Sequence, residues 1–452
     1  MERDRQDGFL GWAGRHPRWA DAVCLLAIVL FAVFLRLVYV AEYTMSPLGV
    51  TAVAPDVAAH DAWARQILAG ETAGAPLYPR FLAMLYRRTG GALGAVRDLK
   101  LLLDAAALAL VWIAVRRLWR RRTACLAGLL WSAYLPLIYY SAELHPEGLA
   151  VFLLSLAFFL WSFVAAAGRS RLVLLGGIGL CLGLAAAVQP LLLPFAVGVA
   201  ALGPWCLPGG TTGRERLASA LVLLVPGLLP AFSPLAGVVA GGELMAAPTP
   251  LHNLAYAWSA QEIPSGSDLP ELQFYTPLMR LPFPRFGWIA PLAVLGAWLR
   301  RRDRRAWLWL LLPAVHTLAL AFVALAGGRQ RLPMLPALLV LAALGLDALI
   351  DAWGTRDVAV WRFATVLLLA VFVPIHLLRP PLPRDSAARS LLLAAEASCR
   401  IGNFDHAEQA AAKAAELAPD LPGLESLREL CRAERGRRAA ETPPEEPRRE
   451  EP

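Results

Sequence analysis

Three acidic or imidazole side chains lie close together, directly after the first strongly apolar segment of the chain. They are Asp56, His60 and Asp61, in the sequence PDVAAHDAWARQILAG of residues 55–70. On a helix, Asp56 and His60 share one face, and Asp61 lies about 100° round from His60. The pattern indicates an acidic, hydrogen-bonding cluster beside a membrane. It also fits a plain helix start, with Asp56 as the N-cap and the charged groups in water.

A second acidic group stands at the boundary between two apolar segments. It consists of Glu143, His145 and Glu147 in the sequence SAELHPEG. Charged groups against a bilayer are costly, so they are candidates for function. The alternative is again a helix start, with Pro146 in the first turn and Glu147 favoured by the helix dipole.

Two further pairs of charged residues fall on the same side of the membrane, by the topology set out below. Arg329 and Arg331 in GGRQRLP could snorkel, but their guanidinium groups are better suited to an anion such as phosphate. Lys100 and Asp104 are four residues apart and predict a salt bridge on one helix. Carboxylates facing two arginines could take a proton from an acceptor and hold an anionic leaving group.

The composition defines what must position these groups. Of 452 residues, 58% are hydrophobic and only 17% are charged, whereas a soluble domain has about 25% charged residues. Long apolar runs recur, so we predict an all-α fold, a polytopic transmembrane helical bundle. The net charge of +8 comes mainly from arginine and sets orientation, so no nucleic-acid partner is expected. The six cysteines show no metal-binding spacing.

Arginine clusters predict the topology, since basic residues favour the cytoplasmic side. Residues 1–21 form a cytoplasmic N-terminus, and residues 22–378 form a transmembrane domain of about 11 spans. A turn between two of these spans is expected at Gln189-Pro190. The long external loops are 42–98 and 240–285, and the odd number of spans places the C-terminus outside. Within the first loop, APLYPRFLAMLYRRTGG predicts an amphipathic helix, which either lies at the membrane interface or packs under a loop.

The tail has a different character from the bundle. Residues 388–432 predict a small helical-hairpin repeat, because Gly402, Phe404, Ala407, Ala414 and Pro419 fall at the offsets of a tetratricopeptide repeat. One such repeat buries too little core alone, so it must pack on the membrane domain or on a protein partner, or be marginal. Residues 433–452 are charged and rich in proline, and we expect them to be disordered.

The two cysteines of the tail, Cys399 and Cys431, could form a disulfide if this part of the chain is oxidised. Spacing alone does not decide between paired and free thiols.

The ordered set of motifs resembles the polytopic C-type membrane glycosyltransferases, in the branch of protein O-mannosyltransferases and aminoarabinose transferases. The resemblance covers about residues 20–350. It is carried by PDVAAHDAWARQILAGE, PLYPRFLAMLY, YYSAELHPEGL and GRQRLPMLP. Two residues depart from the pattern: Gln189 stands where an arginine is expected, and Gln330 stands where an aromatic residue is common.

The resemblance implies transfer of a sugar from a polyprenyl-phosphate donor to an acceptor hydroxyl, with inversion. The acceptor would be a lipid, a glycan or a protein. Asp56 would be the catalytic carboxylate, with His60, Asp61 and Glu143 as further candidates. Arg329 and Arg331 would bind the donor phosphate. His145 and Glu147 would form a second acidic site. The membrane would be a bacterial-type inner membrane, with the active site outside the cytoplasm.

Two other functions fit the same charges. A transporter or lipid flippase would use them as a binding site, and an inactive scaffold would recruit a partner through the tail. A divalent cation could also bind if Asp56, His60, Glu143 and His145 converge.

Overall fold

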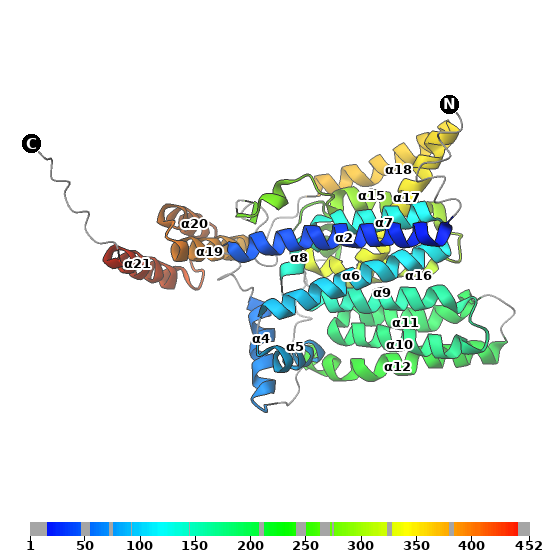
Figure 1. The fold of residues 1–452 in the computed structure, drawn as a ribbon, viewed down its shortest axis with the longest axis horizontal. Coiled ribbons are helices and arrows are strands. Elements are labelled where there is room, and N and C mark those ends of the chain that lie inside the picture. Colours follow the sequence, from blue (N-terminus) through cyan, green and yellow to red (C-terminus); the bar gives the residue numbers. More distant parts are fainter. Residues whose placement is uncertain are drawn as a thin grey trace, which may run out of the picture. The chain divides into compact units, whose positions relative to one another are not determined.

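In the computed structural model, every regular element among the described residues is an α-helix or a short 3-10 helix (Figure 1). The described residues are 16–46, 55–71, 76–91, 93–143, 145–207, 212–240, 250–262, 272–273, 275–322, 328–378 and 384–441. The predicted all-α fold class is therefore confirmed.

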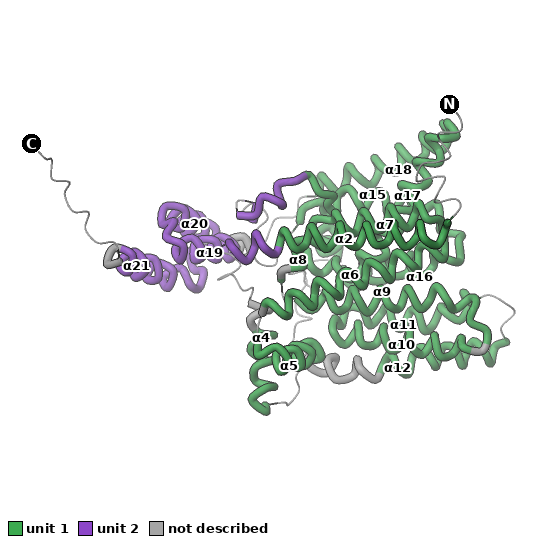
Figure 2. The backbone as a smooth tube through the Cα atoms, viewed as in Figure 1, with its two compact units in different colours: residues 1–39, 56–262, 282–380 green, residues 40–55, 263–281, 381–452 purple. Residues whose placement is uncertain are grey.

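The chain divides into two compact units (Figure 2). Unit 1 comprises residues 1–39, 56–262 and 282–380, and unit 2 comprises residues 40–55, 263–281 and 381–452. The sequence predicted one transmembrane domain over residues 22–378. The structure differs, because short pieces of both long external loops join the tail in unit 2.

The predicted spans coincide with helices. In chain order these are α2 (Pro17–Met45), α6 (Leu93–Leu118), α7 (Arg121–Ala133) with α8 (Leu135–Ala142), α9 (Glu147–Val164), α10 (Arg171–Val188), η2 (Pro190–Leu192) with α11 (Leu193–Leu202) and η3 (Gly203–Cys206), α12 (Gly213–Ala240), α15 (Phe286–Arg300), α16 (Trp307–Ala321), η5 (Gly328–Met334) with α17 (Leu335–Thr355), and α18 (Val358–Leu377). The chain breaks between α10 and η2 at Gln189-Pro190, where a turn was predicted.

Five of these segments are long and apolar enough to cross a membrane: α2, α9, α10, η5 with α17, and α18. The pair α7 and α8, bent by 53°, is a sixth if it counts as one span. The protein is therefore an integral membrane protein. The number of eleven spans stays a prediction.

Small residues let the helices of unit 1 pack closely. A Cβ atom on Gly183 of α10 would lie 2.1 Å from the carbonyl oxygen of Gly227 on α12. In the same way, a Cβ on Gly296 of α15 would lie 1.9 Å from the carbonyl oxygen of Leu341 on α17. Glycine is thus required at these helix crossings, as is common in membrane bundles.

The arginine cluster that set the topology forms ion pairs between helices. Arg116 and Arg121 both contact Asp21 at the start of α2. Arg122 contacts the carboxylates of Asp347 and Asp351 on α17. These pairs fix one end of the bundle.

Two further helices, α4 (Pro55–Leu68) and α5 (Leu77–Thr89), lie across the other end of unit 1, near the start of α6 (Figure 1). One face of α5 is buried, including Tyr78, Leu82 and Tyr86. That face therefore packs on the protein, while a position of the helix at the membrane interface stays a prediction.

Unit 2 contains the predicted helical hairpin, formed by α19 (Arg384–Ile401) and α20 (Phe404–Leu417). Gly402 turns the chain with a φ of +86°. A third helix, α21 (Leu424–Glu441), packs on the hairpin, and a disulfide joins Cys399 of α19 to Cys431 of α21. The expected disordered tail from residue 433 is corrected, since α21 continues to Glu441; residues 442–452 lie outside the described residues.

The hairpin does not stand alone. Tyr275 hydrogen-bonds Ser398 of α19 at 2.9 Å, and Ser398 in turn contacts His406 Nδ1 of α20 at 2.8 Å. The nearby backbone N–H of Leu278 donates to Glu42 at 3.0 Å. Within unit 2, the repeat thus gains partners from a loop segment and from α21, which supplies some of the core that a single repeat lacks.

Candidate functional site

The second acidic group forms a buried turn between α8 and α9. Glu143, His145 and Glu147 are 7%, 1% and 3% exposed. Pro146 directly precedes α9, and Glu147 stands in its first turn, as the helix-start interpretation predicts. A turn of this kind needs partners for its polar groups, because unpaired groups in a low dielectric are costly.

Arg329 of η5 reaches this turn from the other side. Its Nη1 atom donates to His145 Nδ1 at 3.2 Å, and its Nε atom lies 3.8 Å from Glu147 Oε1. A guanidinium has only donors, so His145 accepts through Nδ1 and carries its proton on Nε2. Burial lowers the pKa of His145, which agrees with this neutral form.

His60 of α4 joins the same cluster. Its ring meets the ring of Tyr78 edge to face, with centroids 5.2 Å apart. Burial, with a further contribution from nearby His145, lowers the pKa of His60 to about 4. His60 is therefore neutral near pH 7 and can accept a hydrogen bond, but its low pKa makes it a weak base.

Asp61 points to different partners from His60. Tyr86 Oη donates to Asp61 Oδ1 at 2.6 Å, and Arg65 Nε donates to Oδ2 at 2.9 Å. Burial raises the pKa of Asp61, but these two hydrogen bonds outweigh it, so the pKa lies below its usual value. Asp56 lies in the first turn of α4, and its side chain is outside the described residues.

The two arginines of GGRQRLP diverge. Arg331 is 4% exposed and donates through Nη2 to the backbone oxygens of Tyr256 and Gln261, at 2.8 and 3.1 Å. Its guanidinium also lies over the ring of Phe286. Arg331 is thus engaged by the protein, whereas Arg329 faces the acidic turn.

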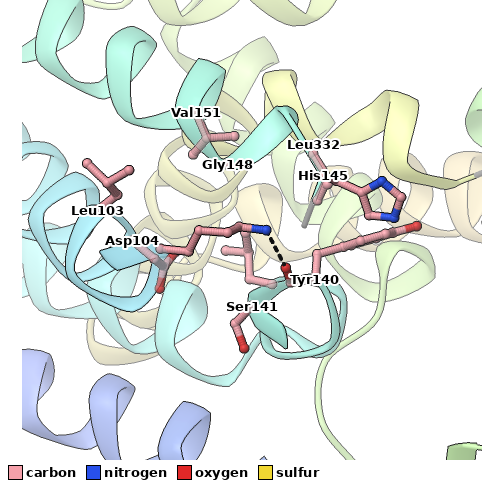
Figure 3. Close-up of a pocket in the computed structure, with 10 residues that line it drawn as sticks. Leu103, Asp104, Tyr140, Ser141, His145, Gly148, Val151 and Leu332 are labelled. Atoms are coloured by element: carbon pink, nitrogen blue, oxygen red, sulfur yellow. Dashed lines mark hydrogen bonds between the residues drawn. The ribbon is translucent and has the colours of Figure 1, made fainter. Parts of the chain in front are cut away.

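A pocket opens beside the turn, with His145, Tyr140 and Ser141 at its polar edge (Figure 3). Lys100 and Asp104 also line it. The predicted salt bridge between them is wrong. Lys100 instead donates to backbone oxygens of the turn, and Asp104 pairs with Arg36.

Sequence reasoning did not single out Tyr78, Tyr140 or Arg36. Tyr78 lies in the quoted PLYP motif, which is the one signal that could have identified it. Arg36 is 1% exposed inside the first apolar helix, and a lone charge within an apolar run is itself a signal of function or pairing.

The two residues that depart from the family pattern contact each other. Gln189 Nε2 donates to Gln330 Oε1 at 3.0 Å.

Among the residues whose placement is described, no group of three or more histidine, cysteine or acidic side chains could hold a metal ion. Asp56, one of the four side chains considered for a cation, lies outside that set.

The fold and the site thus describe a helical integral membrane protein in which an arginine contacts a buried acidic turn. Residues 73–236 match the family model described as dolichyl-phosphate-mannose-protein mannosyltransferase. The predicted resemblance is confirmed over that segment. No curated protein sequence matches the chain.

Similar solved structures share little sequence with this chain. An oligosaccharyltransferase from Archaeoglobus fulgidus tethered with an acceptor peptide is 13% identical, with a TM-score of 0.45, covering 88% of this chain and 59% of that one. AglB from the same organism, in complex with an inhibitory peptide and a dolichol-phosphate, is 12% identical, with a TM-score of 0.48, covering 89% of this chain and 60% of that one. ArnT from Cupriavidus metallidurans, bound to undecaprenyl phosphate, is 18% identical, with a TM-score of 0.46, covering 91% of this chain and 78% of that one. The chain thus spans about three fifths of the oligosaccharyltransferase.

Proposed function

We propose that the protein is a membrane glycosyltransferase that moves a sugar from a polyprenyl-phosphate donor to an acceptor hydroxyl, with inversion. The observation that carries this proposal is the contact of Arg329 with the buried turn of His145 and Glu147, beside His60. A cation and proton acceptors in one water-poor site suit a reaction that releases an anion and removes a proton.

Asp56 is the proposed catalytic carboxylate. It stands on α4 one helical turn before His60, whose ring packs against Tyr78. A carboxylate at that position could deprotonate or orient the acceptor hydroxyl while the polyprenyl phosphate leaves. Glu143, with its backbone oxygen held by Lys100, lies in the same turn and remains a further candidate.

Arg329 is the better candidate of the two arginines for the donor phosphate, because its guanidinium faces the turn. Arg331 would then act by holding the segment of Tyr256 and Gln261 that borders the site. A phosphate at Arg329 would compete with Glu147 for the guanidinium, so donor binding could release this carboxylate.

The lipid chain of the donor could lie in a groove on α15, α16 and α17. Its lining is almost entirely apolar: Trp258, Ala293, Val294, Ala297, Leu310, Pro313, Ala314, Thr317, Leu338 and Leu341. An isoprenoid chain would bury its methyl groups there at a gain of about 25 cal/mol per Å².

The proposed location is a bacterial-type inner membrane, with the site and the C-terminus outside the cytoplasm. The disulfide between Cys399 and Cys431 supports an oxidising compartment for the tail. The acceptor lipid, glycan or protein would approach from that side, and a protein partner could bind the repeat. A divalent cation could assist if Asp56 adds its carboxylate to the cluster.

Asp56→Asn tests the proposal, because asparagine keeps the size and can still cap a helix but cannot act as a base. Purified protein is assayed with a set of radiolabelled polyprenyl-phosphate sugars. We expect sugar transfer to fall by at least about 10²-fold with donor binding largely retained.

Asp61→Asn is the matched control from the same helix, because Asp61 is held by Arg65 and Tyr86. Its loss of transfer should be smaller. Wild-type turnover in a well-folded Asp56→Asn variant would end the proposed mechanism.

A further inference from the structure

Lys100 of α6 reaches the segment that joins α8 to α9. Its ammonium donates to the backbone oxygen of Tyr140 at 3.4 Å and, more closely, to that of Glu143. The helix α8 ends at Ala142, so its last carbonyl groups have no partner within the helix. Lys100 supplies a partner there, and its positive charge also suits the negative end of the helix dipole.

The acidic residue one turn along α6 does not pair with the ammonium of Lys100. Asp104, one turn along α6, is instead held by Arg36 and by Trp131 Nε1 at 3.0 Å. Gly148 in the first turn of α9 lies beside this side chain, since a Cβ there would touch Lys100 Cε at 3.4 Å. The side chain therefore passes over a glycine to end on the turn that follows α8.

We infer that Lys100 is a positioning residue for the proposed transfer reaction: it holds the α8–α9 turn so that His145 and Glu147 face Arg329. This inference rests on the proposed function. Lys100 binds two backbone oxygens of the segment that ends at Glu143, and His145 follows two residues later in the sequence. A shift of this turn would move His145 relative to Arg329, whose contact spans 3.2 Å.

The kinetic test uses Lys100→Met, which keeps the length of the side chain but removes its charge and donors. A misplacement of about 1 Å can cost on the order of 10²-fold in rate, so kcat should fall by about 10- to 100-fold. The donor KM should change little, because the proposed phosphate ligand Arg329 is untouched. Lys100→Arg should restore part of kcat, since it keeps a cationic donor. Leu102→Met, at an exposed position of the same helix, is the control.

Gly148→Val gives a second route to the same effect without altering Lys100. Its branched side chain would push the ammonium away from the turn, so kcat should again fall while the donor KM holds. A rise in donor KM with kcat unchanged would overturn the inference, because Lys100 would then bind donor rather than position the turn. Failure of Lys100→Arg to restore any activity would also overturn it.

Amide hydrogen exchange separates this inference from the proposed function. In Lys100→Met, exchange should speed up in peptides covering residues 140–147 and stay unchanged in α17. Unchanged exchange in the turn would overturn the positioning role. If the wild-type protein transfers no sugar from any donor but exchange in the turn still responds to Lys100→Met, the glycosyltransferase proposal fails while the role of Lys100 in holding the turn stands.

Discussion

The two neighbouring arginines should respond differently to truncation. Arg329→Ala should weaken donor binding by about one to two decades, since a hydrogen bond to a charged group contributes roughly 1.5–3 kcal/mol. Arg331→Ala should instead lower the unfolding temperature, because it removes the buried guanidinium that donates to the backbone oxygens of Tyr256 and Gln261. Titration with polyprenyl phosphate and thermal unfolding measure the two effects.

A variant that keeps the positive charge tests the geometry of the phosphate contact. Arg329→Lys should recover only part of the donor affinity, because the planar fork is lost. Equal donor affinity in wild type and Arg329→Ala would show that the phosphate binds elsewhere.

His60 should make the protein sensitive to mild acid. Its pKa is about 4 in the folded protein, against 6.5 for the unperturbed group, mainly because burial disfavours the charged form. Between these values the unfolded chain binds a proton that the folded chain does not, so stability falls as pH drops from 6.5 towards 4. Thermal unfolding across this range should show a smaller loss for His60→Gln, which cannot titrate. Parallel curves for the two proteins would contradict the assignment.

At the residue scale, sequence spacing located the groups but not their partners. Glu143, His145 and Glu147 lie close together because they are neighbours in the sequence, and their role in a site stays a prediction. The sequence pattern could not show that Arg329 and Arg331 point apart, since a 3-10 helix turns successive side chains to different sides. Nor could it give Lys100 its partner, which depends on α8 packing beside α6.

At the element scale, the glycine contacts predict where the helical bundle is least tolerant of larger side chains. Gly183→Val should strongly destabilise the protein, because even its Cβ would lie 2.1 Å from the carbonyl oxygen of Gly227. Gly176→Ala on the same helix is the control, since its Cβ would meet Val222 at an ordinary 3.6 Å. The measurement is the yield of monodisperse protein in detergent, together with its unfolding temperature. Equal behaviour of the two variants would show that α10 and α12 can separate at low cost.

Helix positions could be predicted because apolar runs and basic clusters alternate along this chain. The break at Gln189-Pro190 could be located because the apolar stretch of residues 172–208 is too long for one span and is interrupted only at this pair. The end of the tail was harder to predict. The charged sequence after Arg432 looks disordered by composition, but α21 is anchored by Leu427 and Cys431 in the core of the repeat and so continues to Glu441.

At the scale of the whole molecule, the predicted topology can be tested by labelling. Single cysteines at Gly213 and Arg302 should react with an impermeant reagent only after the membrane is opened, whereas one at Ser386 should react in intact cells. The native free cysteines Cys24, Cys125, Cys181 and Cys206 are first replaced. Labelling at Ser386 only after permeabilisation would place the repeat in the cytoplasm.

The disulfide of unit 2 also bears on how the protein matures. Cys399 leaves the ribosome 32 residues before Cys431. With the C-terminus outside the cytoplasm, as proposed above, the bond can close only after α21 has been synthesised and exported. A cell that lacks thiol-oxidising enzymes would then make the helical bundle without the bond between Cys399 and Cys431. Proteases could cut the tail of such a protein more easily. The mobility of the newly made chain on a non-reducing gel would therefore record, without any engineered label, whether and when α21 reached an oxidising compartment.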